Sequence, residues 1–274
     1  MPSLSRLRVP PSCLPQQSGS EEEAGLTPGP LSTRAILSWP LPGLGLLDRA
    51  LVRGVALAGR RKIHSIAGLE HIASDRDPFI LALNHGTHLE AILVPPLLFL
   101  LRRGRRIHFM ADWNFRMIPG VGLLYRRAGV ITVARKPARP RFLNILKPLF
   151  TDRISPTEQA RRHLAAGRSI AVFPEGTVNR DPAQLKRGRP GAARLSLETG
   201  VPVVPVGLRF PAVPKGTTVP EGSLMAIEIG PPLVPSAVEK PAYAAIRAWH
   251  GQIMAAIARL SGKSWEFGAQ EAER

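Results

Sequence analysis

Apolar residues along this chain occur in short runs, and segments rich in charge, glycine or proline separate them. From position 78 onward, two kinds of run alternate. Continuous apolar runs rich in branched side chains predict buried strands, and runs with three- and four-residue spacing predict helices. Regular alternation of this kind predicts an α/β fold with a mostly parallel or mixed sheet flanked by helices.

The strand pattern recurs along most of this region and often ends at a glycine, a proline or a polar residue. The strand segments lie at 78–85, 106–111, 129–135, 169–177, 201–210 and 224–230. The segment 169–177 is expected to run into a tight turn, because proline and glycine follow its apolar residues.

Helical spacing occurs between these strands and after them. The helical segments lie at 88–94, 155–167 and 191–200, with a closing stripe formed by Tyr243, Ile246, Trp249, Ile253, Ile257 and Leu260. Ser155, Pro156 and Glu158 have the spacing of an N-cap, an N1 proline and a capping-box glutamate. The helix from 88 is expected to end before Pro95-Pro96, because proline lacks the amide hydrogen that a helix interior uses.

The first part of the chain has a different composition. Residues 1–33 are rich in Pro, Ser, Gly and Glu without an apolar period, which predicts a disordered tail. Residues 34–61 are apolar but contain Asp48, Arg49 and Arg53, and three charges near a bilayer centre would cost about 8–10 kcal/mol. A membrane-spanning helix is therefore excluded for this segment.

The segment 34–61 is nevertheless amphipathic. On a helix, one face carries Leu47, Leu51, Val55 and Ala58, and another carries Arg49, Arg53 and Arg60. Such a helix either lies in the plane of a membrane surface or packs on the protein core as an ordinary surface helix. We divide the chain into a tail (1–33), an amphipathic membrane-docking segment (34–61) and a catalytic domain (62–274).

The net charge of the chain indicates which class of partner it binds. The chain has 37 Lys and Arg against 20 Asp and Glu, a formal net charge of +17. Such a surface attracts phosphate groups and anionic lipid. Aromatic residues make up only 5% and are not interleaved with the basic ones, so nucleic acid is not the expected partner. The charge fits the anionic cytoplasmic face of a membrane better.

Cysteine usage and the N-terminus point to the same compartment. Cys13 is the single cysteine, so the chain cannot form an internal disulfide framework. The sequence EEEAG at 21–25 interrupts any apolar stretch near the start, and we read no signal peptide there. We expect a reducing, cytoplasmic location with peripheral attachment to the membrane.

Polar residues follow the strands at positions where a site is expected. Asn84-His85 follows one apolar run, Pro174-Glu175-Gly176-Thr177 follows another, and Arg135 closes a third. Ligand sites of such folds lie at the carboxyl ends of the strands, so these residues can meet. His85 is then a candidate general base, and Glu90, one helical turn further on, can accept the other ring N–H and stabilise the imidazolium.

The same residues could in principle form a metal site. His85, His88 and Glu90 are close in sequence, but zinc sites on helices use two ligands four residues apart and a distant third. The spacing here is three and two. We therefore expect no metal.

Four ordered segments carry a family resemblance. NHGTHLE (84–90), IPGVGLLYRRAGVITVAR (118–135), FPEGTVNR (173–180) and VPVVPVGL (201–208) resemble the four blocks of the glycerolipid acyltransferase family, typified by 1-acyl-glycerol-3-phosphate acyltransferases. The resemblance covers roughly half of the chain. It implies an enzyme that transfers a fatty acyl group from a thioester, acyl-CoA or acyl carrier protein, to a hydroxyl of a lysophospholipid.

The resemblance also implies roles for individual residues. His85 would remove the acceptor proton while Glu90 holds the imidazole. Arg135, the Glu175-Gly176-Thr177 turn and Arg180 would receive the acceptor phosphate. The acyl thioester is a co-substrate, and no other cofactor is expected.

Two departures from the family pattern leave alternatives open. The family usually has aspartate where this chain has Glu90, and often arginine where this chain has Val178, with Arg180 two positions later. An acyltransferase with an acceptor other than a glycerophosphate therefore stays an alternative. From a different class, a hydrolase or a non-catalytic, basic lipid-binding protein also remains.

Overall fold

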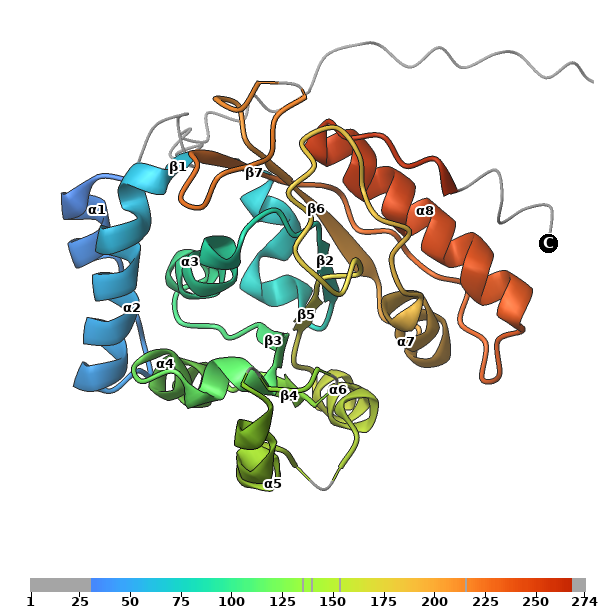
Figure 1. Ribbon diagram of the computed structural model, residues 1–274, viewed down its shortest axis with the longest axis horizontal. Coiled ribbons are helices and arrows are strands. Elements are labelled where there is room, and N and C mark those ends of the chain that lie inside the picture. Colours follow the sequence, from blue (N-terminus) through green and yellow to red (C-terminus); the bar gives the residue numbers. More distant parts are fainter. Residues whose placement is uncertain (1–30, 135, 139, 153, 215, 268–274) are drawn as a thin grey trace, which may run out of the picture.

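The computed structural model describes residues 31–267 except 135, 139, 153 and 215 (Figure 1). The predicted tail at 1–33 falls almost wholly outside the described residues. In the described part, seven strands form one sheet in the order β1-β7-β6-β2-β5-β3-β4. Their bounds are β1 Ile63–Ala67, β2 Ile80–Leu83, β3 His108–Asp112, β4 Ile131–Val133, β5 Ile170–Val172, β6 Val203–Arg209 and β7 Met225–Ile229.

The sheet is mixed. Neighbouring strands are parallel throughout except at the β6–β7 pair, which is antiparallel. At the centre, Leu81 of β2 pairs in register with Ala171 of β5 and Val204 of β6. The predicted fold class, a mostly parallel or mixed sheet flanked by helices, is confirmed.

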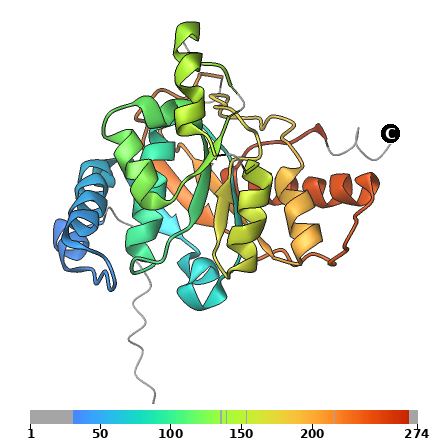
Figure 2. The same cartoon turned by 90° about the horizontal axis from the view of Figure 1, so that it is seen from below.

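Helices cover both faces of this sheet (Figures 1 and 2). Their bounds are α1 Thr33–Ser38, α2 Leu46–Gly59, α3 His88–Leu101, α4 Val121–Ala128, α5 Lys147–Phe150, α6 Pro156–Ala165, α7 Gly191–Thr199 and α8 Tyr243–Ser261. Short 3₁₀ turns add η1 Arg60–Lys62, η2 Leu69–Ile72, η3 Ser74–Arg76, η4 Trp113–Met117 and η5 Arg141–Leu146. Two clusters of buried apolar side chains lie on opposite faces of the sheet. Strand β2 contributes to both, because Leu81 and Leu83 belong to one cluster and Ile80 and Ala82 to the other.

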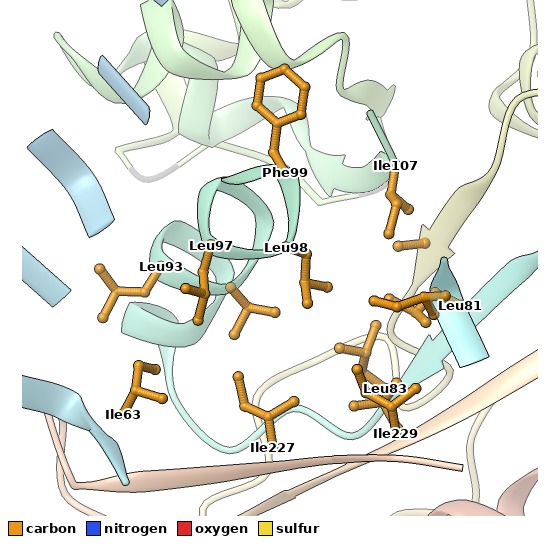
Figure 3. Packing of buried hydrophobic residues seen from close by; sticks show 14 of the residues in the cluster. Ile63, Leu81, Leu83, Leu93, Leu97, Leu98, Phe99, Ile107, Ile227 and Ile229 are labelled. Carbon is orange, nitrogen blue, oxygen red and sulfur yellow. The ribbon is translucent and has the colours of Figure 1, made fainter. Parts of the chain in front are cut away.

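Helix α3 lies at the centre of the buried cluster that contains Leu81 and Leu83 (Figure 3). Its side chains Leu93, Leu97 and Leu98 pack among Ile63, Leu83 and Ile227 of the sheet. Nearly the whole helix is buried, which explains why its sequence is apolar on every side instead of amphipathic. This burial fixes the N-terminus of α3 beside the carboxyl end of β2.

One helix boundary predicted from sequence is wrong. The helix from 88 continues through Pro95 and Pro96 and ends at Leu101. Beyond the prolines, Leu97, Leu98 and Leu100 are all buried in the core. Burying these side chains favours a continued helix enough to offset the hydrogen bonds that proline removes.

The N-terminal helices pack on the cluster around α3. Helix α2 contacts α3 through Val52, Ala56 and Gly59, and a Cβ at Gly59 would lie 2.7 Å from Leu93. Of the apolar face predicted from sequence, Val55 packs against the same core and Leu47 is exposed. The helix is thus anchored to the protein while part of its apolar surface faces solvent. In the part of the chain that the structure describes, no helix combines the length and the apolar composition needed to cross a bilayer.

Candidate active site

The site is built where β2 and β5 end side by side. The two strands are parallel neighbours, so the residues after Leu83 and those after Val172 leave the sheet at the same edge. The main-chain N–H of His85 donates to Glu175 Oε1 at 3.1 Å. The main-chain N–H of Asn179 donates to the carbonyl of His85 at 2.6 Å. Two segments about 90 residues apart in sequence are therefore joined directly at His85.

The turn that carries His85 is fixed on both sides. Before it, Asn84 exchanges two hydrogen bonds with the main chain of Leu208, at 2.6 and 3.0 Å. After it, Gly86 lies against Phe210, where a Cβ would come within 2.4 Å of the ring. A side chain at this position would require the Phe210 ring to move, so glycine allows the close approach seen here.

The imidazole of His85 is held by two side chains. Its Nδ1 lies 2.7 Å from Glu90 Oε1. Its ring stacks on Phe173, with centroids 4.3 Å apart and planes 26° from parallel. A proton on Nδ1 shared with Glu90 leaves the lone pair of Nε2 for an acceptor hydroxyl.

Glu90 is fully buried in the first turn of α3. Besides His85, its Oε1 accepts the main-chain N–H of Gly86 at 2.6 Å. Burial raises the pKa of Glu90, and the hydrogen bond and charge of His85 oppose this rise. The carboxylate is therefore stabilised in its ionised form mainly when the imidazole beside it is protonated.

Glu175 holds the neighbouring turn together. Its Oε1 accepts from the main chain of His85, and its Oε2 accepts from Asn179 Nδ2 at 2.7 Å and from the main chain of Lys186 at 2.9 Å. The carboxylate is buried and does not line the hollow beside His85. Glu175 thus anchors the turn, and the substrate contact that the resemblance implies for it stays a prediction.

Replacing Glu175 with alanine is expected to lower the free energy of unfolding by about 2–4 kcal/mol, because it leaves three donors without an acceptor in a buried site. For a chain of this size the melting temperature should fall by about 5–15 °C. Thermal unfolding followed by circular dichroism measures the change. Glu158→Ala removes two ion pairs at the surface and serves as the control. Equal melting temperatures for the two variants would contradict the anchoring role.

A hollow of about 810 Å³ lies in front of His85. Its walls come from the start of α3, the ends of β3 and β5, and the first turn of α7, with Phe115 and Tyr125 on the side of α4. The turn 174–178 contributes Gly176 and Thr177 to the wall. This volume falls within the range that accommodates small organic ligands.

The rim of the hollow is mainly basic, although Asp112 also lines the hollow and the carboxylate of Glu221 is bound to Arg180. Lys136, Arg180 and Arg189 line the hollow. Glu221 lies 2.5 Å from Arg180 and 2.9 Å from His88 Nδ1, and it accepts the main-chain N–H of His88 at 3.2 Å. Burial acts to raise the pKa of Glu221, but its hydrogen bonds from His88 hold that pKa below its ordinary value. Arg180 is therefore positioned at the rim with its charge partly neutralised.

The structure brings together most of the residues singled out from sequence. His85 and Glu90 are paired, and Gly176, Thr177 and Arg180 line the same hollow. Arg135 lies outside the described residues, so its role stays a prediction. In the parts that are described, no group of three His, Cys, Asp or Glu side chains could hold a metal ion.

Sequence reasoning missed three residues of this site. Phe173 was visible as the first residue of the FPEGT motif, but its stacking on the imidazole was not. Asn179 connects the Glu175 turn to Gln184, and Glu221 lies more than 130 residues from His88, to which it is bonded. Asn179 lies within the FPEGTVNR segment but was given no role there, and no local pattern points to Glu221, because its partner His88 is distant in sequence.

The chain is similar to known acyltransferases in sequence and in fold. A family model described as acyltransferase matches residues 63–209, which include His85, Glu90 and the turn at 174–178. The match covers more than half of the chain.

Two curated relatives have related names. The chloroplastic 1-acyl-sn-glycerol-3-phosphate acyltransferase BAT2 of Brassica napus is 28% identical over 158 residues, 58% of this chain and 39% of that protein. The 1-acyl-sn-glycerol-3-phosphate acyltransferase of Borreliella burgdorferi is 28% identical over 166 residues, 60% of this chain and 57% of that protein. The chain thus spans about half of the length of these relatives.

One solved structure shares the fold. The 1-acyl-sn-glycerophosphate acyltransferase PlsC from Thermotoga maritima superposes with a TM-score of 0.53 at 20% identity, over 78% of this chain and 80% of that one. At this level of identity the likeness shows a common fold.

Proposed function

The chain belongs to the acyltransferase family, and from this premise we propose that it transfers a fatty acyl group from a thioester to a hydroxyl of a lysophospholipid. The pairing of His85 Nδ1 with Glu90 Oε1 at 2.7 Å, beside the hollow, carries the proposal. The names of the two relatives favour 1-acyl-glycerol-3-phosphate as the acceptor.

In this proposal His85 acts as the general base. Its Nε2 takes the proton of the acceptor hydroxyl while the oxygen attacks the thioester carbonyl. Glu90 stabilises the imidazolium that forms. The tetrahedral intermediate then expels the thiolate, which takes the proton back from His85 and leaves as a free thiol. The products are the acylated lipid and the thiol, and no covalent acyl-enzyme forms.

The basic rim supports an acceptor that carries a phosphate. Arg180 and Arg189 lie along the hollow that His85 faces, and guanidinium groups bind phosphate oxygens in pairs. A phosphate bound at Arg180 would compete with Glu221 for the same guanidinium group. We propose that the acceptor phosphate binds at Arg180 and weakens its contact with Glu221.

Apolar surface beside the site supports binding of the fatty chain. Ala91 and Phe173 line both the main hollow and a smaller apolar hollow along α3. Pro95 and Pro96 line this smaller hollow and a further one that reaches α2. We propose that the acyl chain of the thioester extends from His85 along this side of α3. The donor is an acyl-CoA or an acyl carrier protein, and the enzyme works while peripherally attached to the cytoplasmic face of the membrane.

Release of the free thiol from an acyl-CoA or an acyl carrier protein, measured with and without lysophospholipids, tests this function. Thiol release should rise well above background only when an acceptor is present, with 1-acyl-glycerol-3-phosphate giving the largest rise. The acylated lipid should appear in equal amount. Equal release with and without acceptor would show a hydrolase, and a larger rise with lysophosphatidylcholine would show a different acceptor class.

A further inference from the structure

A stripe of large apolar side chains faces solvent on η5 and α5. Phe142, Ile145 and Leu149 are 73%, 81% and 75% exposed. Their spacing of three and four residues places them on one side of this short helical segment. The segment stands out from the body of the molecule beyond β4 (Figures 1 and 2). Single exposed apolar residues are ordinary, but a continuous stripe marks an interaction surface.

The neighbouring segment extends this surface. Ile118 and Leu123, at the junction of η4 and α4, are also exposed. Leu149 and Ile118 line a common hollow that Arg116 and Arg126 also line. We call the five side chains Ile118, Leu123, Phe142, Ile145 and Leu149 the apolar patch.

The charge beside the apolar patch is mainly basic. Arg116 and Arg126 line the hollow that the patch borders, and Arg141 and Lys147 lie on the same helical segment as Phe142. The sequence from 113 to 151 contains no Asp or Glu, with Asp112 and Asp152 on either side of it. Exposed apolar side chains with Lys and Arg beside them are complementary to an anionic bilayer, where the apolar groups enter the interface and the cations stay at the phosphates. A water-soluble protein partner would not require this excess of basic charge.

The position of the apolar patch connects it to the catalytic hollow. Phe115 and Tyr125, from the same elements η4 and α4, line that hollow. On the other side, α4 adjoins α2, because Leu124 and Leu51 line a common hollow. Helix α4 therefore lies between α2 and α5 (Figure 1).

We propose that the apolar patch inserts into the interface of an anionic membrane, as a contact surface separate from residues 34–61. It orients the protein so that the side carrying η4, α4 and α5 faces the lipid. The acceptor lipid then reaches the catalytic hollow from that side. The binding itself is independent of the acyl-transfer reaction, so the two can be tested apart.

The test is the triple variant Phe142→Ser, Ile145→Ser and Leu149→Ser. Full-length proteins are sedimented with vesicles of phosphatidylcholine, with and without phosphatidylglycerol. We expect the partition coefficient onto the anionic vesicles to fall about tenfold or more, because three apolar side chains no longer leave water. The melting temperature should not fall, since all three side chains are exposed in the folded protein. Partitioning equal to that of the wild type would overturn the proposal.

A matched control replaces exposed apolar residues elsewhere. Val234→Ser with Tyr243→Ser changes side chains that are 76% and 62% exposed and lie near the start of α8. Its partitioning should equal that of the wild type, and a loss as large as in the triple variant would overturn the proposal. If the triple variant instead abolished self-association of the wild type in gel filtration and left vesicle binding intact, the apolar patch would be an interface between copies of this chain.

Discussion

Replacing His85 with alanine is expected to lower the rate of acyl transfer by about 10²–10⁴ and to leave the protein folded. Within the described residues, the imidazole of His85 is the one ring that combines a buried carboxylate partner with access to the hollow at the strand ends. The main-chain contacts of His85, to Glu175 and Asn179, do not depend on its side chain. The loss should therefore appear in kcat, measured by thiol release, with little change in melting temperature.

His88 provides the matched control for this experiment. It is three residues from His85, lines the same hollow, and pairs with Glu221 instead of a buried carboxylate. His88→Ala should retain most of the activity, with its main effect on KM through Glu221 and Arg180. If His88→Ala lost as much kcat as His85→Ala, or if His85→Ala stayed active, His85 would not be the general base.

The sequence predicted the fold well where the pattern is set by local chemistry. Buried strands such as β2 and β6 are continuous apolar runs, and helix α6 begins where Ser155 accepts the N–H of Glu158, as its cap spacing indicates. Strand β1 was missed because it lies at the edge of the sheet and buries only Ile63 fully. The end of α3 was predicted too early, because the sequence around Pro95 and Pro96 does not show that the residues beyond them are buried in the core.

The candidate site was predictable where its contacts join residues that are close in sequence. Glu90 follows His85 by one helical turn, so their approach depends on a single helix start, and the structure places them 2.7 Å apart. Glu175 was recognised as part of the site, but its partners Asn179 and Lys186 come from a loop whose path is set by tertiary contacts. Glu221 gave no signal at all, because its partner His88 is distant in sequence.

The two buried carboxylates, Glu175 and Glu90, have different roles in the site. Glu175 accepts hydrogen bonds from the main chain and from Asn179, and so it fixes where the two turns meet. Glu90 contacts the imidazole itself and can respond to its protonation. A substitution at the first should therefore act mainly on stability, and one at the second mainly on the reaction.

Substitution of Glu90 should separate orientation of the imidazole from stabilisation of its charge. Oε1 of Glu90 accepts from both Gly86 and His85, so in Glu90→Gln the amide oxygen is fixed toward both donors and the tautomer of His85 is kept. Only the negative charge is lost, and kcat should fall about 10²-fold. Glu90→Ala loses orientation as well, and its kcat should fall about 10³–10⁴-fold. Thiol release at saturating acceptor measures both.

The pH dependence of stability gives Glu90 a second, independent test. Burial raises its pKa in the folded protein above the ordinary value of 4.5, so the folded state binds the proton more tightly than the unfolded chain. The wild type should therefore lose stability as the pH rises from that value through the folded pKa, and Glu90→Gln should not lose this contribution. Melting temperatures of the two proteins should diverge with rising pH in favour of the glutamine variant. Parallel curves would show that the carboxylate is ionised as readily in the folded protein as in the unfolded chain, and that its charge is already balanced by His85.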